Sequence, residues 1–344
     1  MKKELLLASA LVSTMGVASV AEAVTATMSG AHMTGLQGND TDAADATIAQ
    51  DTTSDFSVSL SETTDGGIGI ATSFMLANEN AGLHTAGLTL TFTDGSKLDV
   101  IKAGNAAGTH DISVPGSAGS PGVTVDTTNN AQTGLDWMGE ATAIGIEWHS
   151  AADFMADGLK VSASISADDG AAATTAVALE SSWGLGATYV TSAGDTAVTI
   201  GAGIADSEFK DNAQDVEGSN GFHVGLSAVT GDLTVAVGFA DGSKAGVSDN
   251  GSDEYTAEVV KAGVKYVTGD LTFNVGIASG DAKDNTVGSS GGSDDSIDTT
   301  SASISYAVAS GVTAILGYTS VEASDEGTAT DDGSAWYIGA NMAF

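Results

Sequence analysis

Residues Leu271-Thr-Phe273-Asn-Val275-Gly-Ile277-Ala278 alternate strictly, with large apolar side chains at the odd positions and polar or small ones at the even positions. Successive side chains of a β-strand point to opposite faces, so this pattern predicts a strand with one apolar face. The same alternation recurs in the segments 88–93, 159–166 and 233–239. The chain therefore repeats one kind of element, a strand whose apolar face has to be covered.

The whole sequence can be divided into about sixteen such strands. One of them, 175–191, could be split at Trp183-Gly184, which would give seventeen. We keep it whole, because 253–268 is similarly long and also leads into a Gly-Asp turn, and because an even number of strands places both termini on one side. The expected strands are 24–36, 54–63, 67–77, 83–93, 96–103, 140–149, 157–168, 175–191, 195–206, 219–230, 232–242, 253–268, 270–280, 297–309, 311–322 and 334–344.

The connections between these strands alternate between short and long. The short ones contain Gly, which supplies the positive φ that tight hairpins require. They include Thr64-Asp65-Gly66-Gly67, Asp94-Gly95-Ser96, Thr230-Gly231-Asp232, Thr268-Gly269-Asp270 and Ser310-Gly311. The long ones are rich in Asp, Asn, Ser and Gly, and are expected at 37–53, 104–139, 207–218, 243–252, 281–296 and 323–333.

The composition combines strong acidity with ample apolar surface. The chain has 10 Lys+Arg against 45 Asp+Glu, a formal net charge of −35, and yet 42% hydrophobic residues. All of the basic residues are Lys. This charge excludes nucleic-acid binding through phosphate contacts. The absence of Cys excludes a disulfide scaffold, a thiolate metal site and a thiol nucleophile.

A transmembrane antiparallel β-barrel explains both the pattern and the composition. In hydrocarbon every backbone N–H and C=O must pair internally, so a sheet has to close on itself. Outward side chains then face lipid, while the acids gather in the loops and the lumen. A secreted or surface-attached all-β protein, used for adhesion or structure, is the alternative, because a sandwich also alternates. It would not demand short and long turns in strict alternation.

The first 23 residues are expected to be a signal peptide. They have a basic start at Lys2 and Lys3, an apolar run, and Ala21-Glu22-Ala23 as the cleavage site. The mature chain, 24–344, contains no run of 18 or more apolar residues, which excludes helical membrane spans. We expect export across the inner membrane and residence in the cell outer membrane.

The last strand ends on an aromatic residue with alternate apolar positions before it. Counting back from Phe344, these are Met342, Ala340, Ile338 and Trp336. This end resembles the closing strand of outer-membrane barrels, whose terminal Phe is an assembly signal for the barrel-insertion machinery. The segment 24–30, Val-Thr-Ala-Thr-Met-Ser-Gly, resembles the first strand of the Gram-negative general porins.

This resemblance implies a sixteen-stranded, homotrimeric porin whose third long loop folds inward and constricts the pore. The matching segment is 104–139, the longest connection, which contains both prolines, Pro115 and Pro121. Proline stiffens a loop, which suits a segment held against the inner wall. A mobile outer loop is the alternative for this segment.

Strand parity and the expected constriction loop supply the candidate pore residues. Glu147 and His149 alternate with Ile144, Ile146 and Trp148, so both are expected to face the lumen. The family usually places Arg opposite the loop acids; this chain has none, and Lys takes that place in the prediction. The candidates are Asp99, Asp111, Asp126, Asp136, Glu140, Glu147, Lys160, Glu180, Lys261 and Lys265, and the strand of Glu180 could contain a bulge.

The predicted function is passive diffusion of ions and small hydrophilic solutes, with a preference for cations that follows from the acidic lumen. A substrate-selective channel of the same fold is a second alternative. No G-x-S-x-G, H-E-x-x-H or phosphate-binding loop is present, and no Ser–His pairing on one strand face stands out, so no enzyme, cofactor or metal site is expected. The acidic loops could bind divalent cations, but they lack EF-hand spacing.

Overall fold

The structure is a computed structural model, and it describes eleven stretches of the chain. They contain the strands and most of the short turns. These stretches are 24–41, 44–77, 83–85, 87–100, 106–116, 144–167, 178–210, 218–245, 254–284, 294–324 and 332–344. The expected signal peptide, residues 1–23, lies outside them, as do 104–105 and 117–139 of the expected constriction loop.

The described residues form an all-β architecture with one short 3-10 helix, η1 (Gly108–His110). No described helix is both long and apolar enough to cross a bilayer. The strands are β1 (Thr25–Thr41), β2 (Ala44–Thr63), β3 (Gly69–Ala77), β4 (Leu83–Thr85), β5 (Leu88–Thr91), β6 (Lys97–Val100), β7 (Ile144–His149), β8 (Leu159–Ala167), β9 (Ala178–Ala193), β10 (Thr196–Lys210), β11 (Ser219–Thr230), β12 (Leu233–Ala245), β13 (Glu254–Thr268), β14 (Leu271–Asp284), β15 (Asp294–Ala309), β16 (Val312–Ser324) and β17 (Gly333–Ala343).

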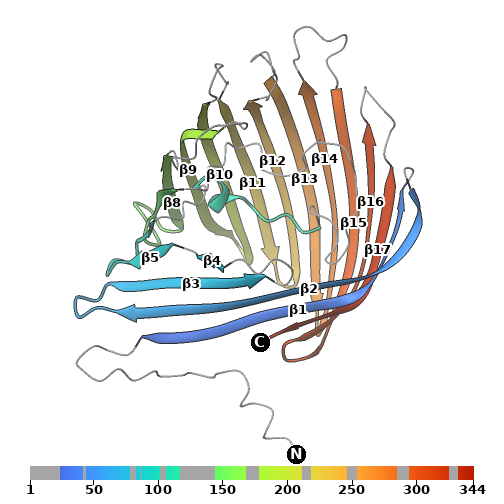
Figure 1. The fold of residues 1–344 in the computed structure, drawn as a ribbon, viewed down its shortest axis with the longest axis horizontal. Coiled ribbons are helices and arrows are strands. Elements are labelled where there is room, and N and C mark those ends of the chain that lie inside the picture. Colours follow the sequence, from blue (N-terminus) through green and yellow to red (C-terminus); the bar gives the residue numbers. More distant parts are fainter. Residues whose placement is uncertain are drawn as a thin grey trace, which may run out of the picture.

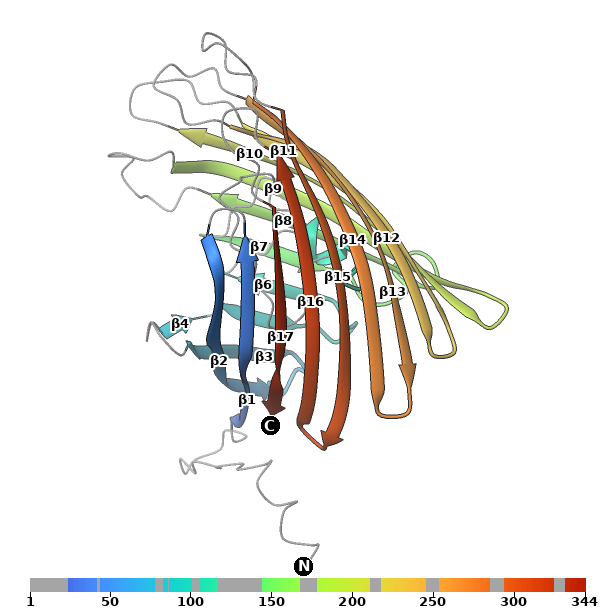
Figure 2. The same ribbon diagram turned by 90° about the vertical axis from the view of Figure 1, so that its right-hand side faces the viewer.

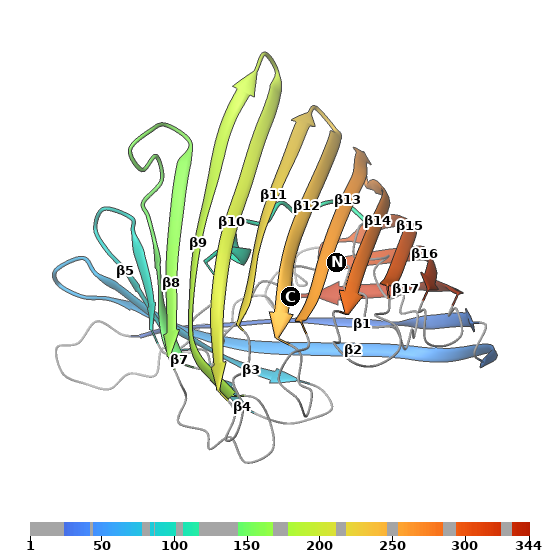
Figure 3. The same ribbon diagram turned by 90° about the horizontal axis from the view of Figure 1, so that it is seen from above.

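These strands form one closed antiparallel sheet (Figures 1 and 2). Apart from β4 and β5, consecutive strands pair with one another, and β1 pairs with β17 as well as with β2, which completes the ring. β4 and β5 both pair with β3, so they share one position and the barrel has sixteen positions. Seen from above, the wall of the barrel passes from β5 through β11 to β17 and returns along β1 (Figure 3). The predicted sixteen-stranded barrel is confirmed.

Burial alternates along the strands in the way that a water-filled barrel requires. Large apolar side chains are exposed on the outside: Val237 is 47% exposed and Ile338 is 53% exposed. Their sequence neighbours on the other face, such as Ala236 and Tyr337, are buried. A soluble protein would cover such a continuous apolar face, whereas lipid contacts it favourably.

The expected tight turns are present at the ends of their hairpins. Gly67, Gly95, Gly231, Gly269 and Gly311 all have positive φ, between 55° and 87°. Gly194, between β9 and β10, has φ 62° and makes a further turn of this kind. The strand 175–191 is not split at Trp183-Gly184, because β9 runs unbroken from Ala178 to Ala193.

Two expectations about strand boundaries were wrong. The segment 37–53 is not a long loop: β1 continues to Thr41 and β2 begins at Ala44, with Asn39 paired to Thr47. Its polar composition is typical of a loop, but strand residues that lie beyond the lipid need no apolar face. The single strand expected at 83–93 is two short ones. Gly87 lies between these two strands, and its carbonyl oxygen accepts a hydrogen bond from the hydroxyl of Thr72, on β3, at 2.9 Å.

Candidate pore site on the inner wall

The described part of the expected constriction loop, residues 106–116, lies inside the barrel (Figure 1). We call it the inward segment. It contains η1, and its side chains Ala106, Ala107, Ile112 and Val114 are buried. The inward course of this segment agrees with the prediction. Asp126, Asp136 and Glu140, which were predicted for the same loop, lie outside the described residues.

A path of glycines on the inner wall receives the inward segment. A Cβ added at Gly201 would overlap the carbonyl oxygen of His110, and one added at Gly263 would overlap that of Pro115. Because glycine has no side chain, the two backbones can approach this closely. We call the six glycines with such contacts the glycine track: Gly186, Gly201, Gly203, Gly225, Gly263 and Gly276, on β9, β10, β11, β13 and β14.

Hydrogen bonds from wall side chains fix the two ends of the inward segment. At one end, the backbone N–H of Ala106 donates to Ser164 Oγ at 3.0 Å. The ring of His223, on β11, donates through Nε2 to the carbonyl oxygen of Ala107 at 2.7 Å. At the other end, the hydroxyl of Ser301, on β15, donates to the carbonyl oxygen of Gly116. The segment is therefore attached to wall strands far apart in the sequence.

His110 is the buried titratable group of the inward segment. Its Nδ1 lies 2.6 Å from Thr188 Oγ1 and its Nε2 lies 2.9 Å from Ser162 Oγ. Burial, together with the smaller effects of positive charge at His149, His223 and Lys160, lowers the pKa of His110 to about 4. His110 is therefore neutral near pH 7, with one ring nitrogen as donor and the other as acceptor.

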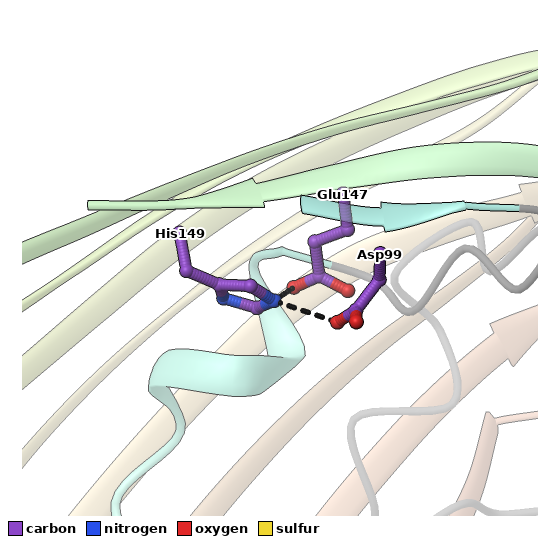
Figure 4. Close-up of side chains that lie close together, drawn as sticks. All are labelled: Asp99, Glu147 and His149. Atoms are coloured by element: carbon purple, nitrogen blue, oxygen red, sulfur yellow. Dashed lines mark hydrogen bonds and ion pairs between the residues drawn. The ribbon is translucent and has the colours of Figure 1, made fainter. Parts of the chain in front are cut away.

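His149, on β7, lies at the centre of a polar cluster with two acids (Figure 4). Its Nε2 is 3.0 Å from Asp99 Oδ2 and 3.8 Å from Glu147 Oε1. Its Nδ1 is 2.9 Å from Ser162 Oγ. The hydroxyl of Thr109, in the inward segment, donates to Glu147 Oε1 at 2.7 Å. The cluster thus lies where the inward segment meets β6 and β7.

The ladder register places several predicted residues on this same inner face. Asp99 pairs with Glu147, Glu147 pairs with Ser164, and His149 pairs with the buried Ser162. Lys160 pairs with Thr188, whose side chain contacts the inward segment. Residues paired across an antiparallel ladder point to the same face, so Asp99, Glu147 and Lys160 all lie inside.

Lys261 and Lys265 lie on β13, far from that cluster around the ring. They alternate with the lipid-facing Val260 and Val264, and they flank Gly263 of the glycine track. From β6 to β13 the ring order counts seven steps in one direction and nine in the other. The two lysines therefore lie almost opposite Asp99 and Glu147.

Two other predicted residues occupy less regular positions. Asp111, in the inward segment, has Oδ1 3.8 Å from His223 Nδ1. Glu180 is exposed and lies at a register shift, because the ladder passes from the Ser181–Glu208 pair to the Leu179–Phe209 pair. The bulge that was considered for this strand is therefore present at Glu180.

Sequence reasoning missed the parts played by His110, His223 and Ser162. Parity could have placed His223 inside, since Phe222 and Val224 on either side of it are exposed to lipid. Sequence reasoning found no Ser–His pairing on one strand face, but the structure brings Ser162 and His149 together as cross-strand partners on the inner face. They come from different strands, and no linear motif joins them.

A closed barrel with an apolar outer face, a polar inner wall and a segment folded into the lumen defines an outer-membrane channel. The family model described as Gram-negative porin matches residues 8–326. The chain belongs to the Gram-negative porin family, and it resides in the outer membrane. No curated protein matches its sequence significantly.

Solved porin structures share this fold at low sequence identity. An anion-selective porin from Comamonas acidovorans is 14% identical with a TM-score of 0.66, over 93% of this chain and 100% of that one. OmpF from Salmonella typhi, in complex with daunomycin, is 14% identical with a TM-score of 0.64, over 93% and 98%. The trimer form of OmpT from Vibrio cholerae is 14% identical with a TM-score of 0.63, over 94% and 100%.

Proposed function

We propose that the protein is a passive pore for ions and small hydrophilic solutes, and that it prefers cations. The observation that carries this proposal is the inward segment, bound to a polar inner wall inside a closed barrel. Such a segment narrows the lumen without filling it, so solutes are sorted by size and charge. The chain supplies a net charge of −35 to the pore and its mouths, which concentrates cations and repels anions, less so at high salt.

A field across the lumen is part of this proposal. Asp99, Glu147 and Asp111 lie on the side of β6 and β7 or on the inward segment, while Lys261 and Lys265 lie almost opposite. Lys160, on β8, is closer to the acids. Separated charges of this kind orient dipolar solutes as they pass, and they act over distances comparable with a narrow lumen. The predicted pore roles of Asp126, Asp136 and Glu140, which lie outside the described residues, and of Glu180 remain part of this proposal.

The assembly is proposed to be a homotrimer in outer-membrane lipid. The trimer form of the Vibrio cholerae relative supports it, as does the exposed apolar outer face. Residues 1–23 would direct export, and residues 24–344 would form the barrel. Trp336, Ile338, Ala340, Met342 and Phe344 would present the assembly signal to the insertion machinery.

We further propose that the protein is not an enzyme. Ser162, His149 and Asp99 have the residue types of a hydrolytic triad, with distances of 2.9 and 3.0 Å. However, Ser162 is only 2% exposed, and its oxygen lies between the rings of His149 and His110. A substrate carbonyl cannot reach an oxygen enclosed in this way. A fluorophosphonate probe is expected to leave Ser162 unlabelled, and labelling there would contradict the proposal.

The first test is conductance of the detergent-purified protein in a planar bilayer under a KCl gradient. We expect large ohmic steps, grouped in threes, and a reversal potential displaced towards that of K⁺. A reversal potential displaced towards that of Cl⁻ would leave a pore but contradict the cation preference. A protein that needs no detergent and does not conduct would favour the secreted β-protein.

A further inference from the structure

We propose that Asp99, Glu147 and His149 form a binding site for a borderline divalent cation of the Zn²⁺ class on the pore wall. The three candidate ligand atoms lie within 4.8 Å of one another. His149 Nε2 is 3.0 Å from Asp99 Oδ2 and 3.8 Å from Glu147 Oε1. Zinc bonds of about 2.0–2.2 Å to nitrogen and oxygen place neighbouring ligand atoms about 3–3.6 Å apart. Small side-chain movements therefore bring all three atoms onto one ion (Figure 4).

The backbone holds these ligands in place before any ion arrives. Asp99 and Glu147 are direct cross-strand partners on β6 and β7, and His149 follows Glu147 by two residues on the same face. Ligands on paired strands are positioned more firmly than ligands on loops. The site also has access to water, because the side chains of Asp99 and His149 are 29% and 22% exposed.

The charges in the site are out of balance without a cation. The Glu147 side chain is only 4% exposed, and Asp99 lies beside it. Among the described residues, the ion-pair partner of both carboxylates is His149. Even an imidazolium at His149 would leave the cluster with a net negative charge. Burial makes such an excess costly, whereas a divalent ion offsets it.

A second layer of hydroxyl groups holds each ligand in the orientation that binding needs. Thr89 donates to Asp99 Oδ1, and Thr109 donates to Glu147 Oε1. Ser162 lies at Nδ1 of His149, so the other ring nitrogen, Nε2, is directed at the two carboxylates. Hydrogen bonds of this kind to the remote nitrogen fix the tautomer of histidines that bind metal ions.

The Ser162 hydroxyl also joins His149 to His110 at 2.9 Å, and His110 to Thr188. In this series of hydrogen bonds from His149 through Ser162 and His110 to Thr188, each pair can exchange the roles of donor and acceptor, so the series can run in either direction. In one direction His149 Nε2–H donates to Asp99. In the other, His149 Nδ1–H donates to Ser162 and Nε2 offers its lone pair to a cation. In the second direction the ring proton of His149 lies on Nδ1, so no proton has to leave the network when a cation occupies Nε2, and its other hydrogen bonds stay satisfied.

The donor set selects the class of ion. One imidazole nitrogen with two carboxylates suits Zn²⁺ and similar first-row ions, whereas Ca²⁺ and Mg²⁺ favour oxygen alone. A bound dication would offset the negative charges of Asp99 and Glu147 on this side of the lumen, close to Thr109 of the inward segment. The bound ion should therefore lower the cation preference of the pore, which gives a second measurement of binding. This consequence rests on the proposed function.

Binding is measured on the full-length protein in detergent, stripped with EDTA, by equilibrium dialysis against Zn²⁺ in the presence of excess Mg²⁺. We expect one Zn²⁺ site per chain, with a Kd that is weaker by more than about a hundredfold in H149Q and in E147Q, because each removes one of the three ligands. S162A, which keeps all three ligands, should weaken binding by about ten- to a hundredfold. H32Q is the matched control, because His32 lies on β1 and bonds Ser54 at 2.7 Å. It should bind as the native chain does.

Every variant must show the heat-modifiable electrophoretic mobility of a folded barrel, so that loss of binding is not loss of fold. Equal Zn²⁺ affinity in the native chain, H149Q and E147Q would overturn the inference, and so would displacement by Mg²⁺. In a bilayer, Zn²⁺ should move the reversal potential towards zero in the native pore but not in H149Q. A conducting pore without Zn²⁺ binding overturns this inference alone. Zn²⁺ binding without conduction overturns the proposed function alone.

Discussion

Gly30 and Phe344 exchange both of their backbone hydrogen bonds, at 3.1 and 3.0 Å, where the first and last strands meet. The Phe344 ring lies so close to Gly30 that an added Cβ would be 2.8 Å from its Cζ. The ring of Phe56, on β2, completes the contact with its centroid 6.4 Å from that of Phe344. The closing aromatic therefore depends on a glycine more than 300 residues earlier.

Replacing Gly30 by Val should weaken closure of the barrel. The new side chain would meet the Phe344 ring and the carbonyl oxygen of Asp55, which lies 2.7 Å from the Cβ position. Crowding of this kind costs about 1–3 kcal/mol. We expect a lower thermal midpoint for the loss of heat-modifiable mobility. Gly66→Ala is the control, because the nearest atom to its Cβ position is 3.9 Å away. An equal effect in both variants would contradict the view that Gly30 is needed where the first and last strands meet.

Gly263→Ala should displace the inward segment and widen the pore. The added methyl group would overlap the carbonyl oxygen of Pro115, which is backbone and cannot rotate away. We expect higher single-channel conductance, with faster hydrogen exchange in residues 106–116. Gly238→Ala on β12 is a matched control, because its Cβ would make only an ordinary 3.5 Å contact with Val114. Unchanged conductance in Gly263→Ala would show that the segment does not limit flow.

Acid should release the inward segment through His110. The free segment has a histidine with an ordinary pKa of 6.5, whereas docking lowers the pKa of His110 to about 4. Between these values the released form takes up a proton that the docked form does not. Docking is therefore fully stable above pH 6.5 and loses stability as the pH falls towards 4. We expect conductance to rise over this window, and the rise should be absent in His110→Asn.

Reversing a charge on the far wall should strengthen the cation preference. Lys261→Glu replaces one positive charge by a negative one on the side of the lumen opposite Asp99 and Glu147. The reversal potential under a KCl gradient should move further towards that of K⁺, and the change should diminish at high salt. A shift that persists unchanged at high salt would contradict a purely electrostatic role for Lys261.

Local alternation was sufficient to predict most of the barrel. Period-two patterns located β11 to the residue and the first residues of β12 and β14 to within one position, because each strand contacts lipid on one side along most of its length. The same logic failed for β1 and β2 near Asn39, where polar side chains alternate with other polar ones. The sequence carries no apolar signal where a strand extends beyond the membrane.

The candidate site was only partly predictable, for a related reason. Parity placed Asp99, Glu147 and Lys261 on the inner face because their neighbours are lipid-facing. The contacts of Ser162 with His149 and His110 depend on ladder register and on where the inward segment lies, and neither follows from a local pattern. The glycine track could not be predicted from the sequence either, because its members are separated by turns and loops and are aligned only by the closed sheet.

The attachment of the inward segment also sets an order of events during biogenesis. Ser301, which binds Gly116, follows it in the chain by 185 residues, and the glycines of β13 and β14 are almost as distant. Contacts of such long sequence separation form only after the intervening chain has been organised. The segment can therefore settle against the wall only once β9 to β15 are paired. A nascent barrel would pass through a wide, leaky stage before its narrow mature form.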